Sequence, residues 1–459
     1  MGLQQPSEAA AAGDSARLDL PDADSPARTG RAGRSRMTPA DGRGGAYDDG
    51  TRRTEILQTA ASLIAYSGLR TSLQEIADAA GILPGSLYHH FESKEAIIIE
   101  LVQRYLDDLD RVAKEARDSL FDGTARGLDD RVTELGRAIA ACGVRHRAAL
   151  LLTLYDPPTA ASDELAALAR RAPTAIDAAM LETLRLGRST GAIRSGVDLE
   201  LLASRLCQSM LHVGVGVSHL SPGAEQVPEM RCRILLRGLA VQPPSDRALD
   251  DSDALRAAQR VIETWDGSTL EDDDRITHLR SVARSEFGRR GYEATTVRDI
   301  AAAAGVSTGA VYRFFGSKDE LLFSMMRSYA GKVATSWDAV LRSSSLPSAK
   351  LDALMWVNVN VLERFSDEFK IQLAWLRRQP PSTPSLGLSF EAQLRKVKSL
   401  LTAGAKASDL QLDGSTAEIR ARCVYELLWT PENIVRDAGT STAHALARDT
   451  VLRGALVRS

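Results

Sequence analysis

The fold of this chain is decided by a stretch that occurs twice, as GILPGSLYHHFESK at Gly81–Lys94 and as GVSTGAVYRFFGSK at Gly305–Lys318. The two stretches lie 224 residues apart, and six of their fourteen positions are identical. A weaker echo, LLRG at Leu235–Gly238 and VLRG at Val451–Gly454, lies near the end of each half. Self-similarity at the period of a whole domain indicates a tandem duplication of a unit of about 190 residues.

The first stretch is preceded by the pattern of a short capped helix. Ser72 stands where it can cap this helix, and Glu75 follows three residues later as the return partner of a capping box. Apolar residues then recur at the i, i+3, i+4, i+7 spacing of a helix face. Gly81 marks a sharp turn that requires positive φ, and a third helix starts at about Pro84. A short helix, a glycine turn and a second short helix predict a helix-turn-helix motif over residues 72–91.

The second copy repeats this pattern over residues 296–315. Thr296 takes the place of the first cap and Gly305 that of the turn, and Ser307 can cap the recognition helix. The first copy has Leu83 at this last position, followed by Pro84, which is tolerated at the first helical position. The leucine removes a cap, so the start of the first recognition helix can be shifted.

The residue types on both recognition helices suit contact with DNA. A recognition helix presents its N-terminal residues to base edges and neighbouring groups to phosphates. The candidate base readers are Pro84, Ser86 and His89 in the first copy and Thr308 and Arg313 in the second, where Arg313 can pair bidentately with guanine. The candidate phosphate contacts are Tyr88, His90, Lys94, Tyr312 and Lys318, and the caps Ser72, Thr296 and Ser307 and the small residues Gly85 and Gly309 complete the DNA-binding set.

Charge separates the two copies, although the whole chain has a net charge of only −3. Residues 52–97 contain four basic and five acidic side chains, whereas residues 275–321 contain eight and five. Affinity for DNA comes mostly from phosphate neutralisation. We therefore expect the second copy to bind DNA more strongly, unless the arginine-containing N-terminal tail compensates for the first.

Both stretches resemble the TetR/AcrR family of one-component bacterial repressors. The resemblance covers Ile76–Ile97 and Ile300–Leu321 and consists of a glycine turn, a small residue, Tyr, two variable residues, Phe, one variable residue, Ser and Lys. It implies an all-α chain with two tandem units, each a three-helix helix-turn-helix head followed by a helical-bundle effector and dimerisation domain. Two departures matter: most family members carry one head, and Gly68–Gly81 is one residue shorter than Gly291–Gly305. The first head could therefore sit differently on DNA.

This resemblance and the composition along the chain divide it into six segments. We expect a disordered, arginine-containing tail at 1–50, a first head at 51–111, a first effector domain at 112–241, an acidic linker at 242–271, a second head at 272–332 and a second effector domain at 333–459. The tail is poor in large apolar residues, so it cannot offset its ordering entropy by burial. It either contacts DNA or only solubilises the chain.

The effector is expected to be a small hydrophobic molecule. The segment Leu83–Phe91 looks like that of family members that control steroid or fatty-acyl catabolism in actinobacteria, which implies a steroid-like or acyl-CoA ligand. The second effector domain carries Trp337, Trp356, Trp375 and Trp429, which can line an apolar pocket. The alternative is that each tryptophan is a core residue. The sequence does not say which half binds the effector.

Other classes of function find less support in the sequence. It shows no nucleophile motif, phosphate loop or clustered metal ligands, so we expect no catalysis, cofactor or metal. Four sparse cysteines favour a reducing compartment, and the N-terminus lacks the pattern of a signal peptide. No segment suits a membrane span, so we expect a cytoplasmic, nucleoid-associated protein.

Two hypotheses remain. The leading one is a repressor, released by its ligand, whose two heads form an intramolecular pseudo-dimer on an asymmetric double-stranded operator; a further homodimer would present four heads. In the alternative, only the second head binds DNA, and the first head is a protein-interaction module.

Overall fold

The computed structural model describes residues 45–68, 71–120, 126–155, 157, 161–215, 223–266, 274–376 and 390–458. These residues form helices joined by turns, and within them only two isolated bridges have β geometry. Residues 50–459 form one compact unit, which contains both copies of the helix-turn-helix pattern. No helix in the described ranges is long and apolar enough to cross a membrane. An all-α fold with two tandem copies is confirmed.

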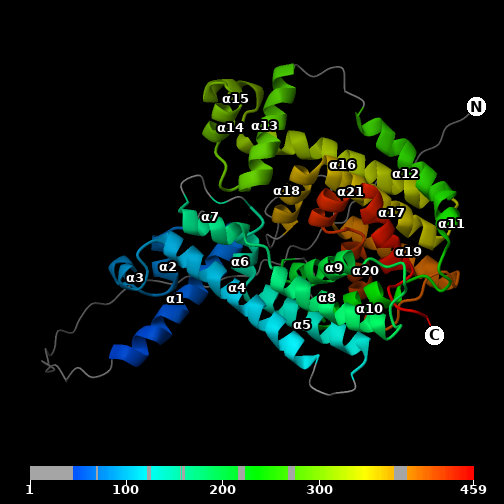
Figure 1. The fold of residues 1–459 in the computed structure, drawn as a ribbon. Helices are drawn as coiled ribbons and strands as arrows, with labels where there is room; N and C mark the ends of the chain where they lie inside the picture. Colours follow the sequence, from blue (N-terminus) through cyan, green and yellow to red (C-terminus); the bar gives the residue numbers. More distant parts are fainter. Residues whose placement is uncertain are drawn as a thin grey trace, which may run out of the picture. The chain divides into compact units, whose positions relative to one another are not determined.

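The two copies follow one another along the chain (Figure 1). The first comprises α1 (Gly45–Ser67), α2 (Leu73–Ala79), α3 (Pro84–His90), α4 (Lys94–Ser119), α5 (Leu128–Arg145), α6 (Arg147–Leu152), α7 (Asp163–Arg170), α8 (Thr174–Ser189), α9 (Leu199–Leu211) and α10 (Val227–Arg237). The second comprises α11 (Asp246–Asp250), α12 (Asp253–Glu263), α13 (Asp274–Arg290), α14 (Val297–Ala303), α15 (Thr308–Phe314), α16 (Lys318–Arg342), α17 (Pro347–Arg364), α18 (Ser366–Leu376), α19 (Phe390–Lys406), α20 (Ala417–Leu427), α21 (Glu432–Ala447) and a π-helical turn at Arg448–Leu452.

The duplication can be followed helix by helix beyond the heads. Helices α5 and α17 both have 18 residues and begin 219 residues apart, and α6 and α18 begin at the same spacing. The N-caps of α9 and α20, Asp198 and Thr416, lie 218 residues apart. We call residues related by these spacings equivalent positions.

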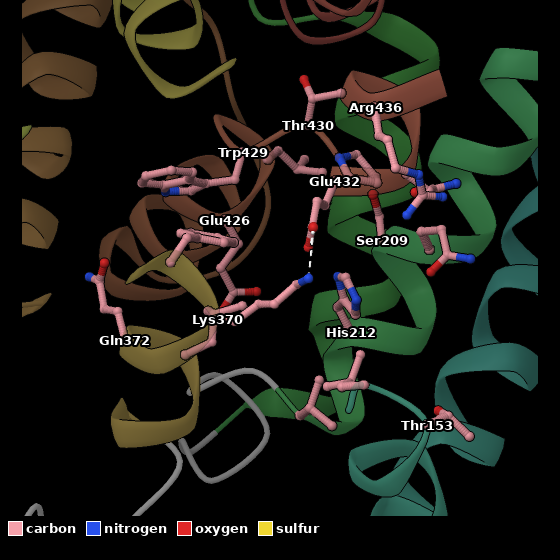
Figure 2. Close-up of a pocket in the computed structure, with 18 of the residues that line it drawn as sticks. Thr153, Ser209, His212, Lys370, Gln372, Glu426, Trp429, Thr430, Glu432 and Arg436 are labelled. Carbon is pink, nitrogen blue, oxygen red and sulfur yellow. Dashed lines mark ion pairs between the residues drawn. The ribbon is translucent and has the colours of Figure 1, made fainter. Parts of the chain in front are cut away.

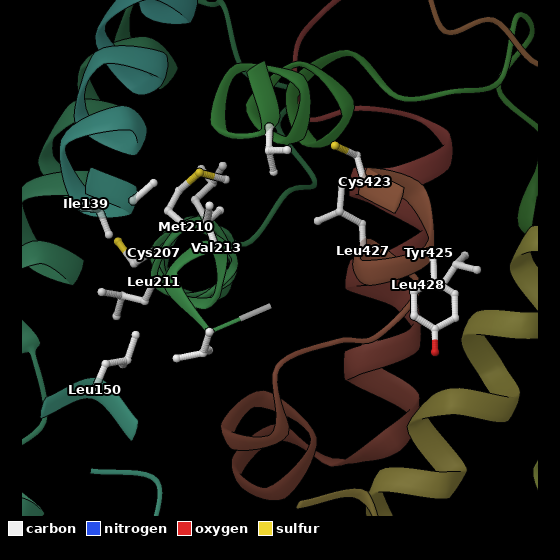
Figure 3. Close-up of a cluster of buried hydrophobic side chains, with 14 of the residues drawn as sticks. Ile139, Leu150, Cys207, Met210, Leu211, Val213, Cys423, Tyr425, Leu427 and Leu428 are labelled. Carbon is white, nitrogen blue, oxygen red and sulfur yellow. The ribbon is translucent and has the colours of Figure 1, made fainter. Parts of the chain in front are cut away.

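The two copies pack against each other through their last helices. Helix α10 contacts α20, and α9 contacts α21. Figure 3 shows apolar side chains in this region, among them Met210 of α9 and Leu427 of α20. A fully buried arginine of α9, Arg205, donates to the carbonyl oxygen of Leu427 at 2.9 Å and to Oγ1 of Thr430 at 3.0 Å. Burial lowers the pKa of Arg205 to about 9. Losing either acceptor would leave a desolvated cation under-satisfied, so these bonds tie the copies together.

The segments that follow α10 and the π-helical turn exchange backbone hydrogen bonds as a reciprocal set. The amides of Leu239 and Ala240 donate to the carbonyls of Val451 and Leu452 at 2.8 and 3.0 Å, and those of Ala455 and Leu456 donate to Leu235 and Leu236 at 3.2 and 2.8 Å. The four carbonyl acceptors belong to the LLRG and VLRG motifs of the sequence, and the four donors follow these motifs directly. This exchange gives the two copies a local pseudo-two-fold relation.

Two glycines make this exchange possible. Gly238 and Gly454 have φ of 73° and 78°, and a Cβ on either would collide with the backbone of the other segment. Only glycine adopts a positive φ without strain and also leaves room for the backbone of the other segment.

Part of the expected linker at 242–271 belongs to the core. Helix α12 packs against α16 and α17. Its apolar face is buried, including Leu255 and Ile262, and Trp265 lies edge-to-face on Phe365 at 5.4 Å. The segment therefore contributes apolar surface to the second copy.

The expected tail at 1–50 lies outside the described residues as far as residue 44. Residues 45–50 form the first turns of α1. The arginines assigned to the tail, between residues 28 and 43, are all in the undescribed part.

Candidate nucleic-acid interface and ligand cavity

The second helix of each head is held by a capping box. In the first head, Oγ of Ser72 accepts from the Glu75 amide at 3.1 Å, and the Glu75 carboxylate accepts from the Ser72 amide at 2.6 Å. In the second, Thr296 and Asp299 make the same pair of bonds at 3.2 and 2.7 Å. These bonds to Ser72 lower the pKa of Glu75. The capping role assigned to Ser72 and Thr296 is thus their observed local structure.

The turn into each recognition helix is made by a left-handed glycine. Gly81 has φ of 66° and Gly305 has φ of 67°, as the sequence predicts. The helices that follow start differently, because Ser307 accepts from the Ala310 amide at 3.2 Å whereas Leu83 provides no side-chain cap. The Leu83 side chain is 76% exposed.

The recognition helices bury one residue each and expose most of the others. Leu87 of α3 and Val311 of α15 are buried, and full burial of such a side chain contributes roughly 1.5–3 kcal/mol. The exposed positions are Gly85, Ser86, Tyr88 and His89 on α3 and Gly309, Tyr312 and Arg313 on α15, while Pro84, His90 and Thr308 are half-buried. The proposed base readers of both copies therefore lie on or at the edge of a solvent-exposed helix face.

A lysine opens the long helix that follows each recognition helix. Lys94 is the first residue of α4 and Lys318 that of α16, each behind a serine cap. Burial lowers the pKa of Lys94, and the nearby Glu75 carboxylate opposes that shift. The Lys318 ammonium lies 4.0 Å from the ring centroid of Tyr292. Each lysine thus has a neighbour outside its own helix, a carboxylate of α2 for Lys94 and the Tyr292 ring for Lys318.

In each head, an arginine of the first helix lies over the phenylalanine that follows the recognition helix. The Arg53 guanidinium lies 4.2 Å from the Phe91 ring centroid, and that of Arg280 lies 5.9 Å from Phe315. Arg52 also donates to the carbonyl oxygen of Ala80 at the end of α2, at 2.9 Å. These contacts connect the first helix to the recognition helix. Sequence analysis missed them because Arg53 and Arg280 occupy different positions in their helices.

The turn that is one residue shorter in the first head is closed by the same bond as its counterpart. Oγ1 of Thr71 donates to the Gly68 carbonyl at 3.1 Å, and Oγ1 of Thr295 donates to the Gly291 carbonyl at 2.9 Å. Both threonines are buried. The length difference therefore lies before the threonine, and α2 and α14 each begin directly after their caps.

Comparisons with known proteins match this geometry. The model of the bacterial regulatory proteins of the tetR family matches residues 56–101 and 279–325, which are the two heads. The HTH-type transcriptional repressor KstR2 of Rhodococcus jostii (strain RHA1) is 35% identical over 197 residues, which span 41% of this chain and 91% of that protein. KstR2 of Mycobacterium tuberculosis (strain ATCC 25618 / H37Rv) is 32% identical over 194 residues, 41% of this chain and 93% of the relative.

This chain belongs to the TetR family. It is a DNA-binding transcriptional regulator with two heads in one chain, and its relatives in the comparisons are regulators, not enzymes. Among solved structures, one titled as the ketosteroid transcriptional regulator KstR2 of Mycobacterium tuberculosis aligns with 29% identity and a TM-score of 0.34, covering 40% of this chain and 92% of that one.

Outside the two heads, the helices of this TetR-family regulator enclose a cavity of about 540 Å³. It is lined by residues of both copies, from α8, α9 and α10 on one side and from α18, α20 and α21 on the other (Figure 2). Its apolar wall includes Phe369 and Trp429, whose rings stack with centroids 4.5 Å apart. A volume of this size suits a drug-sized ligand.

The four tryptophans proposed as ligand contacts occupy different environments. Trp429 lines the cavity. Trp337 is fully buried in the core and donates to Oδ1 of Asn358 at 3.1 Å, and Trp356 packs on His444 with ring centroids 5.1 Å apart. The side chain of Trp375 is outside the described part of the chain. Of the described three, only Trp429 lies on this cavity.

One group of side chains in the described residues has the geometry of metal ligands. Ligand atoms of Asp108, Cys142 and His146 lie within 4.8 Å of one another, between α4 and α5. The Asp108 carboxylate is already paired with Arg111, Arg145 and His146. Burial raises the pKa of the Cys142 thiol to about 12, which disfavours the thiolate that a metal needs. We interpret the group as a cluster of ion pairs around Asp108 that connects α4 with the end of α5.

Proposed function

We propose that this protein is a repressor whose two unlike heads read an asymmetric operator and which a small hydrophobic ligand releases from DNA. The observation that carries the proposal is the location of the differences between the heads. The capping boxes, glycine turns and buried residues correspond, whereas the exposed or half-buried positions Pro84/Thr308, Ser86/Ala310 and His89/Arg313 differ. Differences on the exposed face alter base readout and leave the scaffold intact.

Charge supports unequal roles for the heads. Arg313 is exposed on α15 and can pair bidentately with guanine, whereas the exposed His89 of α3 offers one ring edge. The second head region also carries a net charge of +3 against −1 for the first. The second head would therefore supply the larger share of phosphate neutralisation and of guanine readout.

The packing of the copies supports an intramolecular pseudo-dimer. Helices α9 and α10 contact α21 and α20 within one chain, as the corresponding helices of two subunits would do in a dimer. The reciprocal exchange around Gly238 and Gly454 extends this arrangement to the ends of both copies. A single chain would then carry a complete pair of heads, without a second copy of the protein.

The cavity supports regulation by a ligand. It lies between the copies, so a ligand that fits one arrangement of the copies better than another would shift the population between them. Of the two ligand classes that the sequence suggests, steroid-like and acyl-CoA, both have an apolar body that the Phe369–Trp429 wall can contact. We propose that release from DNA follows from this shift.

Selection of duplexes from a random pool by the full-length chain would test the operator hypothesis. We expect one chain to protect two dissimilar half-sites, with guanine specified in only one of them. Selected sites that form a perfect inverted repeat, or that bind two chains per duplex, would contradict the proposal. The selected duplex then serves as the probe in all binding measurements below.

The alternative, in which the first head contacts a protein, has its own supporting observation. Leu83 places a 76%-exposed apolar side chain beside the recognition helix of the head with the lower charge. The double variant Tyr88→Ala with Lys94→Ala separates the hypotheses. We expect it to weaken binding to the selected duplex, and unchanged affinity would favour the interaction module.

A further inference from the structure

The cavity between the copies is lined by equivalent positions of both. Thr153 and Leu154 follow α6, and the residues 219 positions later, Gln372 and Leu373, lie on α18; helices α9 and α20 are related by a spacing of 218. The equivalent pairs that line the cavity include Thr153/Gln372, Leu154/Leu373, Gln208/Glu426, Ser209/Leu427 and His212/Thr430. A cavity bounded on opposite sides by equivalent positions lies on the pseudo-two-fold axis that relates the copies.

We propose that this cavity binds a single ligand per two-headed chain, on the internal pseudo-two-fold axis, and that the ligand is an uncharged, mainly apolar molecule. Ligand binding itself stands on the cavity alone, while its effect on DNA rests on the proposed function. A family member with one ligand site inside each copy would bind two ligands per pair of heads, so stoichiometry distinguishes the two arrangements.

The charges of the lining favour an uncharged ligand. Three basic side chains face the cavity, and each has a carboxylate partner on it: Lys370 with Glu432 at 3.0 Å, Arg436 with Asp437 at 2.8 Å, and the buried Arg231 with Glu426. Asp177 adds a fourth acidic group. A polyanion would face an excess of carboxylates and would have to displace an ion pair to reach a cation.

The apolar lining indicates the shape of the ligand body. Phe369 and Trp429 stack, and Phe390 lies edge-to-face on Tyr425 with centroids 5.1 Å apart. Such walls present flat apolar surface. Polar side chains, including Ser209 and Thr153, lie elsewhere on the lining (Figure 2). They can form hydrogen bonds with a hydroxyl or carbonyl group of the ligand. A flat, fused-ring body with few polar atoms fits this distribution.

The duplication allows the two sides of the axis to differ. The position equivalent to Gln208 is Glu426, and the position equivalent to His212 is Thr430. In a homodimer an on-axis site has identical sides, so an asymmetric ligand has two equal poses. Here unlike side chains make the poses unequal, which favours one orientation and so contacts each copy differently.

A stoichiometric titration of the full-length chain tests this inference. The probe is Nile red, an uncharged flat fluorophore, added to protein well above its dissociation constant, with palmitoyl-CoA as the anionic competitor. The variants Leu154→Trp and Leu373→Trp fill the cavity from equivalent positions of the two copies. Leu186→Trp and Leu346→Trp add the same side chain at leucines that are 41% and 61% exposed and do not line the cavity.

We expect a breakpoint at one probe per chain, and a loss of affinity of about tenfold or more for each cavity variant, since overfilling a site costs binding energy. Both control variants should bind as the wild type does, and palmitoyl-CoA should displace the probe poorly. Two probes per chain, with each cavity variant losing one of them, would overturn the shared site. Tight displacement by palmitoyl-CoA, or no saturable binding, would overturn the ligand class.

Anisotropy with the selected duplex separates this inference from the proposed function. Leu154→Trp and Leu373→Trp should keep the wild-type DNA affinity if the chain is folded, because neither residue is on a head. Probe binding without specific DNA binding would contradict the proposed function and leave the shared site standing. Specific DNA binding without probe binding would contradict the shared site and leave the proposed DNA-binding function standing.

Discussion

The two heads keep the same scaffold and differ in what they expose. Each has a capping box on its second helix and a glycine near φ of 66° at its turn. Each also closes the preceding turn with a buried threonine. In contrast, the start of the recognition helix has an exposed leucine in one head and a serine cap in the other. After the duplication, both heads thus kept the bonds that form the second helix and its two turns. The start of the recognition helix changed.

The same contrast recurs in the helices that follow the heads. The reciprocal backbone bonds around Gly238 and Gly454 use corresponding atoms in both copies. The cavity, by comparison, has unlike side chains at equivalent positions such as Gln208 and Glu426. A contact that depends on backbone geometry tolerates few changes, whereas a lining position tolerates many as long as the walls stay packed.

The largest difference is expected for the exposed residues of the recognition helices. Arg313→Ala should weaken binding of the full chain to the selected duplex by about 1–3 kcal/mol, which is roughly fivefold to 150-fold, because a bidentate base contact is lost. His89→Ala should cost less. Fluorescence anisotropy at one fixed salt concentration measures both.

The matched control for this prediction is Arg298→Ala, which removes an exposed positive charge from α14 rather than from the recognition helix. It should weaken binding to all duplexes alike and leave the preference for guanine unchanged. Equal losses for Arg313→Ala and His89→Ala would show that the heads contribute equally.

The turn glycines should give equal costs in the two heads. Gly81→Ala and Gly305→Ala force a Cβ into the left-handed region, which costs about 1–2 kcal/mol per residue. No neighbouring atom lies within 4 Å of a Cβ at either site, so this backbone cost stands alone. Hydrogen exchange of the recognition-helix amides reports the local stability of each head separately.

Gly85→Ala is the control for the turn glycines, since Gly85 lies within α3 and has open space around a Cβ. It should leave the exchange rates unchanged or slow them. A cost at Gly81 that greatly exceeds that at Gly305 would mean that the shorter preceding turn strains the first head.

Exchanging the caps should shift the stability of the heads in opposite directions. Leu83→Ser adds a side-chain acceptor to the start of α3 and should stabilise it by about 1 kcal/mol, whereas Ser307→Leu should destabilise α15 by a similar amount. Hydrogen exchange of α3 and α15 measures both changes. If Leu83→Ser stabilises α3 but weakens DNA binding, then the leucine itself contributes to recognition.

The smallest expected effect is a shared sensitivity to acid. The pKa of Asp299 is lowered chiefly by its hydrogen bond with Thr296, as that of Glu75 is by Ser72. A carboxyl whose pKa is lowered by folding stabilises the folded state above its ordinary pKa, and this contribution is lost as the pH falls through the folded value. Exchange of α2 and α14 should therefore accelerate below the ordinary carboxyl range in both heads.

The variants Glu75→Gln and Asp299→Asn should flatten this acid dependence in their own head only. Both substitutions keep a side-chain acceptor for the cap amide, so the helices should still form at neutral pH. An acid dependence that persists in the variants would assign it to other carboxyl groups.

Much of the head could be predicted from the sequence because its bonds are local. The Ser72–Glu75 box spans three residues, and the positive φ of Gly81 follows from its place after a short helix. Repetition of the same signals at Thr296 and Gly305 made the prediction specific. The sequence thereby determined the all-α fold, the two heads and the family of this protein.

The tertiary structure decided what depends on residues far apart in the chain. Arg205 reaches Thr430, and Gly238 meets the backbone next to Gly454, and neither pairing has a signal in local periodicity. The cavity arises where equivalent helices of the two copies meet, so only Trp429 among the described tryptophan candidates lies on it. Helix caps and turns are set by neighbours within a few residues, whereas burial and cavity shape are set by packing across more than two hundred.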